Sequence, residues 1–202
     1  MRKLEDAYLH KGLRKQLVEV LRTKGITDEQ VLEAIGSIPR HFFLDSAFDR
    51  IAYEDRAFPI AANQTISQPY TVAYQTQLLQ IKPGEKVLEI GTGSMYQTTV
   101  LAAMGAKVFT IERQKQLFDL TPFYIFKQQY SDIHFSFGDG FEGLPELAPF
   151  DKILITAAAP NVPEKLWAQL KVNGKMIIPL DEEGAEQMML RLTKKKDGKE
   201  KR

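Results

Sequence analysis

Two closely spaced glycines follow a short apolar run in KVLEIGTGS, residues 86–94. Gly91 can adopt the backbone angles that a sharp strand-to-helix turn requires, and Gly93 leaves room for a ligand beside the main chain. Glu112 ends the next apolar run, KVFTIE. An acid at the end of the neighbouring parallel strand can accept hydrogen bonds from ribose hydroxyls. This chemistry indicates a cofactor that carries adenosine.

The residues after the turn narrow the choice of cofactor. A dinucleotide turn reads G-x-G-x-x-G, but Tyr96 stands at the last glycine position, and the chain has no G-x-x-x-x-G-K-[ST] loop for a nucleoside triphosphate. A further turn, Gly138-Asp139-Gly140, follows a third apolar run. The three turns together favour S-adenosylmethionine, whose adenosine carries no phosphate.

Composition sets limits on the partners. The chain has 202 residues, of which 44% are hydrophobic, so one substantial core and a single domain are expected. Lys and Arg number 27 against 26 Asp and Glu, which gives no support for binding to nucleic acid. The chain contains no cysteine, so disulfides and thiolate metal sites are excluded.

The remaining candidates for metal binding are three histidines, His10, His41 and His134. Their spacing is not that of metal ligands, so packing roles and no metal site are expected. The amino terminus lacks a long apolar run, which predicts neither a signal peptide nor a membrane span. We therefore expect a cytoplasmic protein that does not bind membranes, and a monomer.

The elements that must position the glycine turn and the acids alternate along the chain. The pattern predicts a doubly wound, mostly parallel α/β sheet of the Rossmann-like kind, with an N-terminal helical extension. Such a sheet binds ligands beyond the carboxyl ends of its strands, where Gly91, Glu112, Asp139 and Thr156 should lie. The predicted strands lie at about 86–90, 107–112, 132–137, 152–156 and 174–180.

The N-terminal part reads as helical. Apolar spacing predicts a helix over residues 3–24, and Thr27 with Gln30 forms a capping-box pattern that opens a second helix ending at Gly36. Residues 37–68 read as an ordered connecting segment without clear periodicity.

Two more helices are expected, one regular and one interrupted. A helix from Pro69 to about Gln80 follows the connecting segment, and Pro122 should break the helical stretch from Gln114 to Gln129. The single domain 1–202 then divides into three parts. These are a helical cap with the substrate loop (1–68), a cofactor-binding α/β core (69–193) and a charged, frayed tail (194–202).

Three longer runs resemble one family. They are AFPIAANQTISQPYTVAYQTQLLQIKPGEKVLEIGTGS, GDGFEGLPELAPFDKILITAAAP and QLKVNGKMIIPL, and they are similar to protein-L-isoaspartate O-methyltransferases, which are class I S-adenosylmethionine-dependent enzymes. The glycine turn is common to many methyltransferases, but NQTISQP at 63–69 and TAAAP at 156–160 are far more particular to this family. The resemblance covers nearly the whole chain, to about residue 193.

The resemblance implies a protein-repair reaction. A methyl group would pass from S-adenosylmethionine to the free carboxylate of an L-isoaspartyl residue in a damaged peptide or protein, leaving S-adenosylhomocysteine. Succinimide formation from the ester would then allow return to a normal aspartyl linkage. The carboxylate is already ionised at neutral pH and the sulfonium methyl is already activated, so the enzyme needs alignment rather than a strong base.

The resemblance also implies roles for individual residues. Ser67 matches the active-site serine, whose hydroxyl can bond the substrate carboxylate; without the family motif, a serine before Pro69 would read as a helix start. The substrate set is Ser67, Thr156, Ala157 and Ala158. The cofactor set is Thr65, Ile66, Glu89, Gly91, Thr92, Gly93, Ser94, Glu112, Arg113, Asp139 and Gly140.

Glu89 keeps two interpretations open. It could engage the methionine portion of the cofactor through water or backbone groups, or it could simply stabilise the turn.

Two departures from the family pattern remain. Met95 stands where the family usually has a third glycine, and its side chain could swing away or occupy space that the methionine moiety needs. The chain ends in TKKKDGKEKR where relatives generally continue into another strand, so the sheet should be one strand short or the sequence truncated.

These departures keep other functions open. One is a non-catalytic or weakly active cofactor- or peptide-binding relative, and another is a class I methyltransferase with a different substrate. A nicotinamide-dependent oxidoreductase is a distant further alternative.

Overall fold

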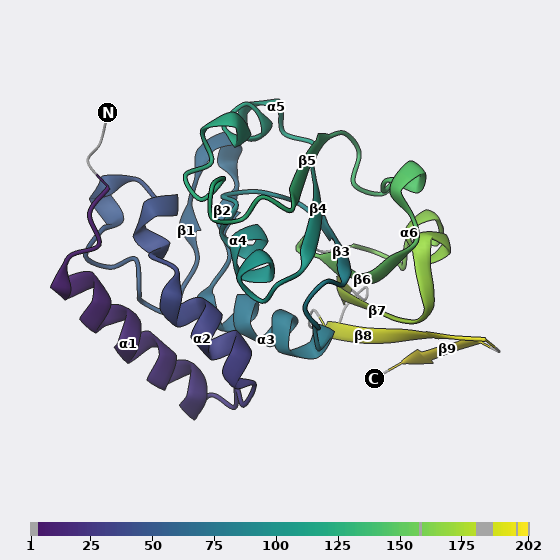
Figure 1. Ribbon diagram of the computed structural model, residues 1–202, viewed down its shortest axis with the longest axis horizontal. Helices are drawn as coiled ribbons and strands as arrows, with labels where there is room; N and C mark the ends of the chain where they lie inside the picture. The colour runs from purple at the N-terminus through teal and green to yellow at the C-terminus, as the bar shows by residue number, and fades with distance from the viewer. Residues whose placement is uncertain (1–3, 158, 181–187, 197, 202) are drawn as a thin grey trace.

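A mixed sheet with helices on both faces forms the centre of the protein (Figure 1). The computed structural model describes residues 4–157, 159–180, 188–196 and 198–201. Within them the sheet has seven strands in the order β5-β4-β3-β6-β7-β8-β9. The strands are β3 (Lys86–Ile90), β4 (Lys107–Glu112), β5 (Ile133–Phe137), β6 (Phe150–Ile155), β7 (Leu170–Leu180), β8 (Met188–Lys195) and β9 (Gly198–Lys201).

The strand order confirms the predicted doubly wound fold. From β3 the chain steps outward through β4 to β5, then returns to place β6 on the other side of β3. The pairs β3–β4, β4–β5, β3–β6 and β6–β7 are parallel. The pairs β7–β8 and β8–β9 are antiparallel. The reversal beside β3 leaves a crevice at the carboxyl ends of β3 and β6, where open α/β sheets bind ligands. All five predicted strands form, although β6 and β7 begin earlier than expected.

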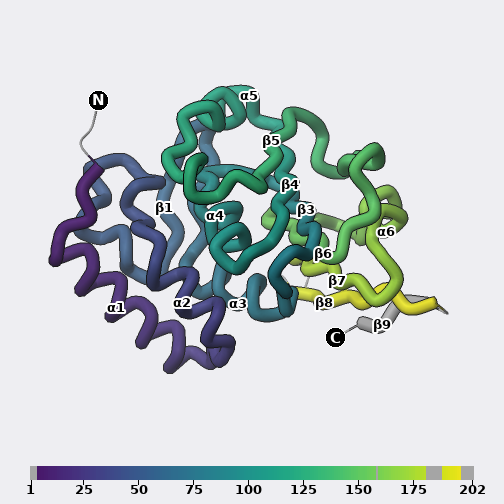
Figure 2. Tube along the Cα trace, viewed as in Figure 1, coloured from purple at the N-terminus to yellow at the C-terminus, as the bar shows by residue number. Residues whose placement is uncertain are grey.

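Helices cover the two faces of the sheet unequally. The helices are α1 (Tyr8–Thr23), α2 (Glu29–Ser37), α3 (Pro69–Leu79), α4 (Tyr96–Ala103), α5 (Lys115–Phe118) and α6 (Glu164–Gln169). On one face, α3 and α4 pack against Val87 and Val108, with α1 and α2 beyond them (Figure 2). On the other face, Leu166 of α6 joins Leu88 and Phe150. Because β3 is buried on both faces, its sequence reads as a continuous apolar run interrupted by one acid.

The predicted capping box at the start of α2 is wrong in its details. The side chain of Asp28, not of Thr27, accepts hydrogen bonds from the backbone N–H groups of Gln30 (3.0 Å) and Val31 (3.4 Å). The backbone N–H of Thr27 donates instead to Oε1 of Gln77 in α3, at 2.7 Å. A partner distant in the sequence therefore takes Thr27 away from the helix that it was expected to cap.

The connecting segment is ordered, as predicted, and holds short elements only. It contains 3₁₀ turns at Arg40–Phe43, Ser46–Phe48 and Ala61–Asn63. A two-stranded antiparallel ladder joins β1 (Phe58–Pro59) to β2 (Thr65–Ile66). Such brief elements show no period that sequence analysis could detect, because each ends before a second repeat.

The break at Pro122 is confirmed. Helix α5 ends at Phe118, and a 3₁₀ turn at Thr121–Phe123 replaces the helical continuation. Proline has no N–H and its ring clashes with the preceding turn, so a regular helix cannot pass through this position.

The prediction of a frayed tail over residues 194–202 is wrong, because this segment joins the sheet. β8 pairs antiparallel with β7, and β9 pairs with β8. The Lys194 ammonium donates to the backbone carbonyls of Trp167 (2.8 Å) and Leu170 (2.7 Å), where α6 ends. A lysine at the carboxyl end of a helix satisfies orphan carbonyls and faces the negative end of the helix dipole, so this charge has a structural role.

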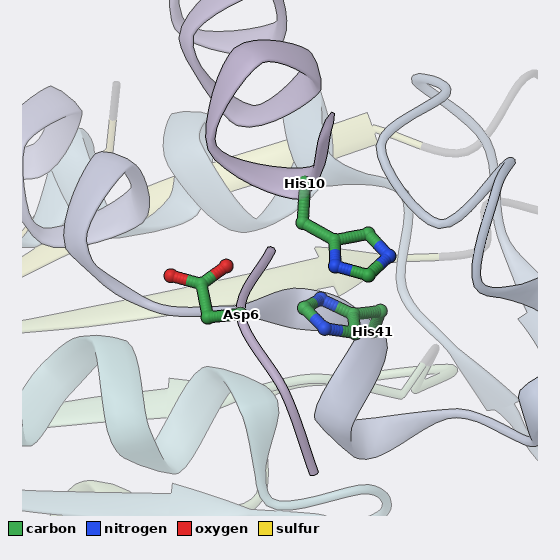
Figure 3. Close-up of side chains that lie close together, drawn as sticks. All are labelled: Asp6, His10 and His41. Carbon is green, nitrogen blue, oxygen red and sulfur yellow. The ribbon is translucent and has the colours of Figure 1, made fainter. Parts of the chain in front are cut away.

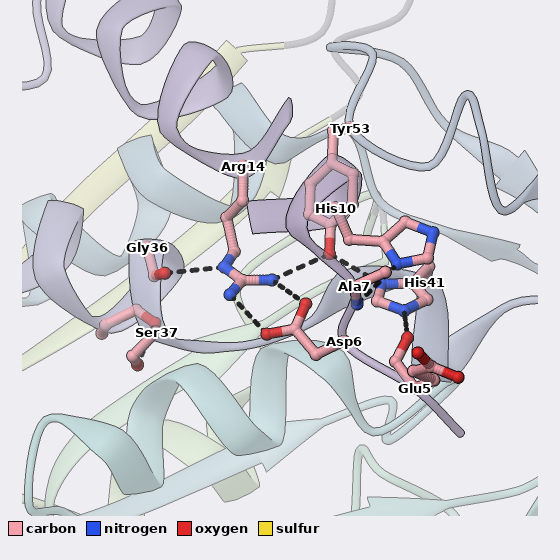
Figure 4. A network of polar contacts seen from close by, with 10 residues as sticks. Glu5, Asp6, Ala7, His10, Arg14, Gly36, Ser37, His41 and Tyr53 are labelled. Carbon is pink, nitrogen blue, oxygen red and sulfur yellow. Dashed lines mark hydrogen bonds and ion pairs between the residues drawn. The ribbon is translucent and has the colours of Figure 1, made fainter. Parts of the chain in front are cut away.

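A polar network ties the amino-terminal segment to the helical cap (Figure 4). Nη1 and Nη2 of Arg14 donate to the two carboxylate oxygens of Asp6 at 3.0 and 2.9 Å. Nδ1 of His41 lies 2.7 Å from the Tyr53 hydroxyl, and the His10 ring stacks on the His41 ring at 3.8 Å. The hydrogen bond from Arg14 lowers the pKa of Asp6, and burial lowers the pKa of His41.

Asp6, His10 and His41 also place potential metal-ligating atoms within 4.8 Å of one another (Figure 3). This proximity is invisible in their spacing along the chain. Both Asp6 oxygens already bind a guanidinium, whose positive charge disfavours a second cation there. The contacts therefore support the packing role expected for these two histidines.

None of the helices in the described residues combines the length and the apolar character that crossing a membrane needs.

Candidate functional site

A cleft of about 470 Å³ opens at the carboxyl ends of β3, β4 and β6. It brings together the loop before α3, the glycine turn after β3 and the two turns that follow β4 and β5. The predicted site residues that line it are Thr65, Ile66, Ser67, Gly91, Thr92, Gly93, Ser94, Glu112, Arg113, Asp139, Gly140, Thr156 and Ala157. Ala158 lies outside the described residues.

Gly91 and Thr156 meet at the point where the strand order reverses. The Thr156 hydroxyl donates to the carbonyl of Ile90 at 2.8 Å and lies 3.2 Å from the carbonyl oxygen of Gly91. Gly91 has a φ of +96°, and a Cβ there would lie 2.5 Å from Oγ1 of Thr156. Only glycine fits this position, and its lack of a side chain lets the two strand ends close the base of the cleft.

Glu112 is held firmly at the end of β4. Its Oε2 accepts a hydrogen bond from the Gly93 N–H at 2.9 Å, and its Oε1 accepts one from the Gln114 N–H at 2.8 Å. The residue is only 4% exposed. Each carboxylate oxygen has two lone pairs, so each retains an acceptor position for a ribose hydroxyl. Glu112 thus also joins the glycine turn to the next loop, a structural role that its position in the sequence does not reveal.

The turn after β5 closes against the end of β3. Oδ1 of Asp139 accepts a hydrogen bond from the backbone N–H of Phe141 at 2.9 Å, and Asp139 itself is exposed. A Cβ on Gly140 would lie 2.3 Å from Cγ2 of Ile90. Glycine is required here because the turn backbone packs directly on the strand end.

Ser67 lies on the rim of the cleft, between β2 and α3. It is half-buried, and no group among the described residues forms a hydrogen bond with its hydroxyl. The hydroxyl is therefore available to donate to a bound carboxylate.

Glu89 does not line the cleft. It is fully buried beneath α4, where the Thr98 hydroxyl donates to its Oε2 at 2.5 Å. Burial raises the pKa of its carboxyl to about 8; the hydrogen bond from Thr98 opposes this shift, and the charge of Glu112 adds to it. This placement favours the structural interpretation of Glu89 over contact with the cofactor.

Met95 does not line the cleft. Its φ of 69° is left-handed, and its backbone caps α4, since its N–H donates to Thr92 and its carbonyl accepts from Thr99. The residue lines an adjoining, largely apolar cavity of about 510 Å³, together with Phe42, Phe43 and other residues; this cavity shares Gly93, Ser94 and Leu117 with the cleft. The left-handed backbone explains why a glycine would suit this position.

We expect Met95→Gly to leave the dissociation constant for S-adenosylhomocysteine within about threefold of wild type, because no side-chain contact with the cleft is lost. Isothermal titration calorimetry on both proteins measures this constant. A wild-type chain that fails to bind, with binding restored by the glycine, would instead support the interpretation as a disabled relative.

Sequence reasoning missed several residues that line the cleft, most of them apolar. These residues are Val72, Ile90, Tyr96, Gln97, Ile111, Gln114, Leu117, Phe141, Ile155 and Pro160. The sequence could have indicated Ile90, Ile111 and Ile155 as lining residues, because they lie at or next to the carboxyl ends of predicted strands. The others depend on how α3, α4 and the α5 segment pack, which the sequence pattern does not specify.

Comparisons with known proteins agree with this geometry. The model of the family Protein-L-isoaspartate(D-aspartate) O-methyltransferase (PCMT) matches residues 12–202. The protein-L-isoaspartate O-methyltransferase of Christiangramia forsetii is 59% identical over 177 residues, covering 88% of this chain and 83% of that protein. The protein of the same name from Cytophaga hutchinsonii is 57% identical over 191 residues, covering 95% of this chain and 86% of that protein.

Solved structures show the same architecture. A protein-L-isoaspartate O-methyltransferase from Plasmodium falciparum, in complex with S-adenosyl-L-homocysteine, superimposes with a TM-score of 0.78 at 29% identity, covering 93% of this chain and 92% of that chain. A second protein-L-isoaspartate O-methyltransferase gives a TM-score of 0.81 at 28% identity over 91% of this chain. This chain covers 60% of that longer one.

Proposed function

Because the chain belongs to the protein-L-isoaspartate(D-aspartate) O-methyltransferase family, we propose that it methylates the free carboxylate of L-isoaspartyl residues in damaged peptides and proteins. The methyl donor is S-adenosylmethionine and the product is S-adenosylhomocysteine. One observation carries the proposal: the Ser67 loop, the glycine turn and Glu112 line the same cleft.

The cleft suits a nucleoside cofactor without phosphates. Gly93 leaves the main chain open to a ligand, and the bonded Glu112 carboxylate keeps acceptor positions for ribose hydroxyls. Asp139 and Gly140 follow the neighbouring strand β5, and we assign them to the adenine end of the cofactor. The apolar walls contributed by Ile90, Ile111 and other residues suit the flat faces of a nucleobase.

Alignment is the main catalytic task of the remaining residues. The cofactor supplies an activated methyl group, so the carboxylate oxygen bonds to the methyl carbon while the carbon–sulfur pair leaves on sulfur. Ser67 donates a hydrogen bond to the substrate carboxylate and fixes its orientation. Thr156 and Ala157, which also line the cleft, present main chain to the peptide. The carboxylate is ionised at neutral pH, so no general base is needed.

The decisive experiment is a radiolabelled methyl-transfer assay with an isoaspartyl peptide and its aspartyl twin. Methylation of the isoaspartyl peptide alone supports the proposal. Equal labelling of both peptides, or labelling of neither by a chain that binds S-adenosylhomocysteine, contradicts it.

We expect Ser67→Ala to lower kcat/KM on the isoaspartyl peptide by about 1.5 kcal/mol, roughly tenfold, because one hydrogen bond to a charged group is lost. The dissociation constant for S-adenosylhomocysteine should stay within about threefold of wild type. Steady-state kinetics and calorimetry measure the two quantities. Ser37→Ala, on the exposed side of α2, is the matched control. An equal loss of activity and cofactor affinity would assign Ser67 a structural role instead.

The proposal extends to a cytoplasmic monomer that requires neither nucleic acid nor a membrane. The absence of cysteine and the near-balance of charge are compatible with this setting. Light scattering after size-exclusion chromatography tests the oligomeric state.

A further inference from the structure

The residue that precedes α3 leaves the start of that helix uncapped. Gln68 is the N-cap residue, and its side chain makes no capping hydrogen bond. The first N–H groups of any helix have no partner within the helix and need an acceptor from elsewhere. Ser67 is the residue immediately before this cap, so the acceptor that fixes the start of α3 also constrains the backbone of Ser67.

Asp55, from the connecting segment, supplies that acceptor. Its Oδ1 accepts a hydrogen bond from the backbone N–H of Tyr70 in the first turn of α3, at 2.7 Å. Nε2 of Gln68 donates to the backbone carbonyl of Asp55 at 3.0 Å and to Oδ2 at 3.2 Å. Oδ2 also pairs with the Lys24 ammonium at 2.6 Å, and the Asp55 side chain is only 9% exposed. Both oxygens are thus committed to the α3 start and to the end of α1.

The other side of Ser67 is fixed by the β1–β2 ladder. Phe58 pairs with Ile66, and Pro59 pairs with Thr65. The backbone N–H of Ile60 donates to the carbonyl of Gln64 at 2.8 Å, which closes the loop. Ser67 is therefore the single residue between two anchored segments.

We propose that Asp55 is a positioning residue for Ser67, and this rests on the function proposed above. Asp55 does not line the cleft, so it acts through the backbone of Gln68 and α3 rather than on the substrate. It holds the start of α3 so that the Ser67 hydroxyl meets the substrate carboxylate in one orientation. A charged acceptor at a helix N-terminus also faces the positive end of the helix dipole, which strengthens the anchor.

The test uses Asp55→Ala, Asp55→Asn and a matched control, Asp28→Ala. Asp28 likewise accepts from backbone N–H groups at the start of a helix, as the N-cap residue of α2, and it does not line the cleft. Misplacement of a catalytic group by about 1 Å can cost about 100-fold in rate, and we expect Asp55→Ala to lower kcat by about 10- to 30-fold. The asparagine retains an acceptor for Tyr70, so kcat should recover to within about threefold of wild type.

Two readouts separate positioning from general destabilisation. Calorimetry should show an S-adenosylhomocysteine dissociation constant within about threefold of wild type in all variants. The Asp28→Ala control should lose stability to denaturant yet keep its kcat. Wild-type kcat in folded Asp55→Ala, or cofactor affinity falling in proportion to kcat, would overturn the proposal.

Hydrogen exchange provides a measurement that does not depend on the substrate. Asp55→Ala should accelerate exchange at the amide of Tyr70, whose N–H donates to Asp55, whereas Asp28→Ala should not. If wild type fails to methylate the isoaspartyl peptide, the proposed function fails and the exchange data alone decide the role of Asp55. Unchanged protection at the Tyr70 amide would refute it.

Discussion

Replacing Glu112 with alanine weakens S-adenosylhomocysteine binding by about 1.5–3 kcal/mol, the range for hydrogen bonds to a charged group. Two effects act together. The ribose hydroxyls lose their acceptor, and the N–H groups of Gly93 and Gln114 lose the carboxylate that holds the glycine turn in place. Isothermal titration calorimetry on wild type and variant measures the difference.

The two effects can be separated by a second variant and a control. Glu112→Gln retains one acceptor oxygen, so its loss of affinity should lie between wild type and Glu112→Ala. Glu142→Ala removes an exposed acid that pairs with Lys165 at the surface, and it should not change the affinity. An unchanged dissociation constant in Glu112→Ala would contradict the ribose assignment.

The sheet and most of the cleft could be predicted because their signals are local. A parallel strand buried on both faces must be a short apolar run, and the turn after it must contain glycine where the backbone is left-handed, as at Gly91. The residues after successive strands then meet at one edge. Gly91, Glu112, Asp139 and Thr156 were found by this rule alone, without any knowledge of their contacts.

The features that sequence reasoning missed depend on partners distant in the chain. Thr27 does not cap its helix because Gln77 in α3 competes for it. In the sequence Lys194 belongs to a charged tail, and only the structure shows that the end of α6 lies beside it. Met95 stands beside the glycine turn in the sequence, but it does not line the cleft, and its left-handed backbone cannot be predicted from its sequence neighbours. Asp55 reads as an ordinary loop acid for the same reason.

Glu89 gives the second large expected effect, on stability rather than on binding. Its folded-state pKa of about 8 lies above the ordinary value of 4.5. Below pH 4.5 the carboxyl is neutral in both the folded and unfolded states. Between these two values the unfolded chain ionises while the folded chain keeps its proton, so the free energy of unfolding falls as pH rises. Above pH 8 the full penalty of a buried charge applies.

Glu89→Gln removes this penalty because glutamine stays neutral and its oxygen can still accept from Thr98. The difference in unfolding free energy between variant and wild type should therefore grow, in favour of the variant, by about 2–4 kcal/mol from pH 5 to pH 8.5. Urea denaturation at a series of pH values measures it. Glu33→Gln, an exposed site on α2, should follow the wild-type profile. Parallel profiles for wild type and Glu89→Gln would show instead that Glu89 ionises in the folded protein without cost, through a polar partner for its Oε1 that the described residues do not provide.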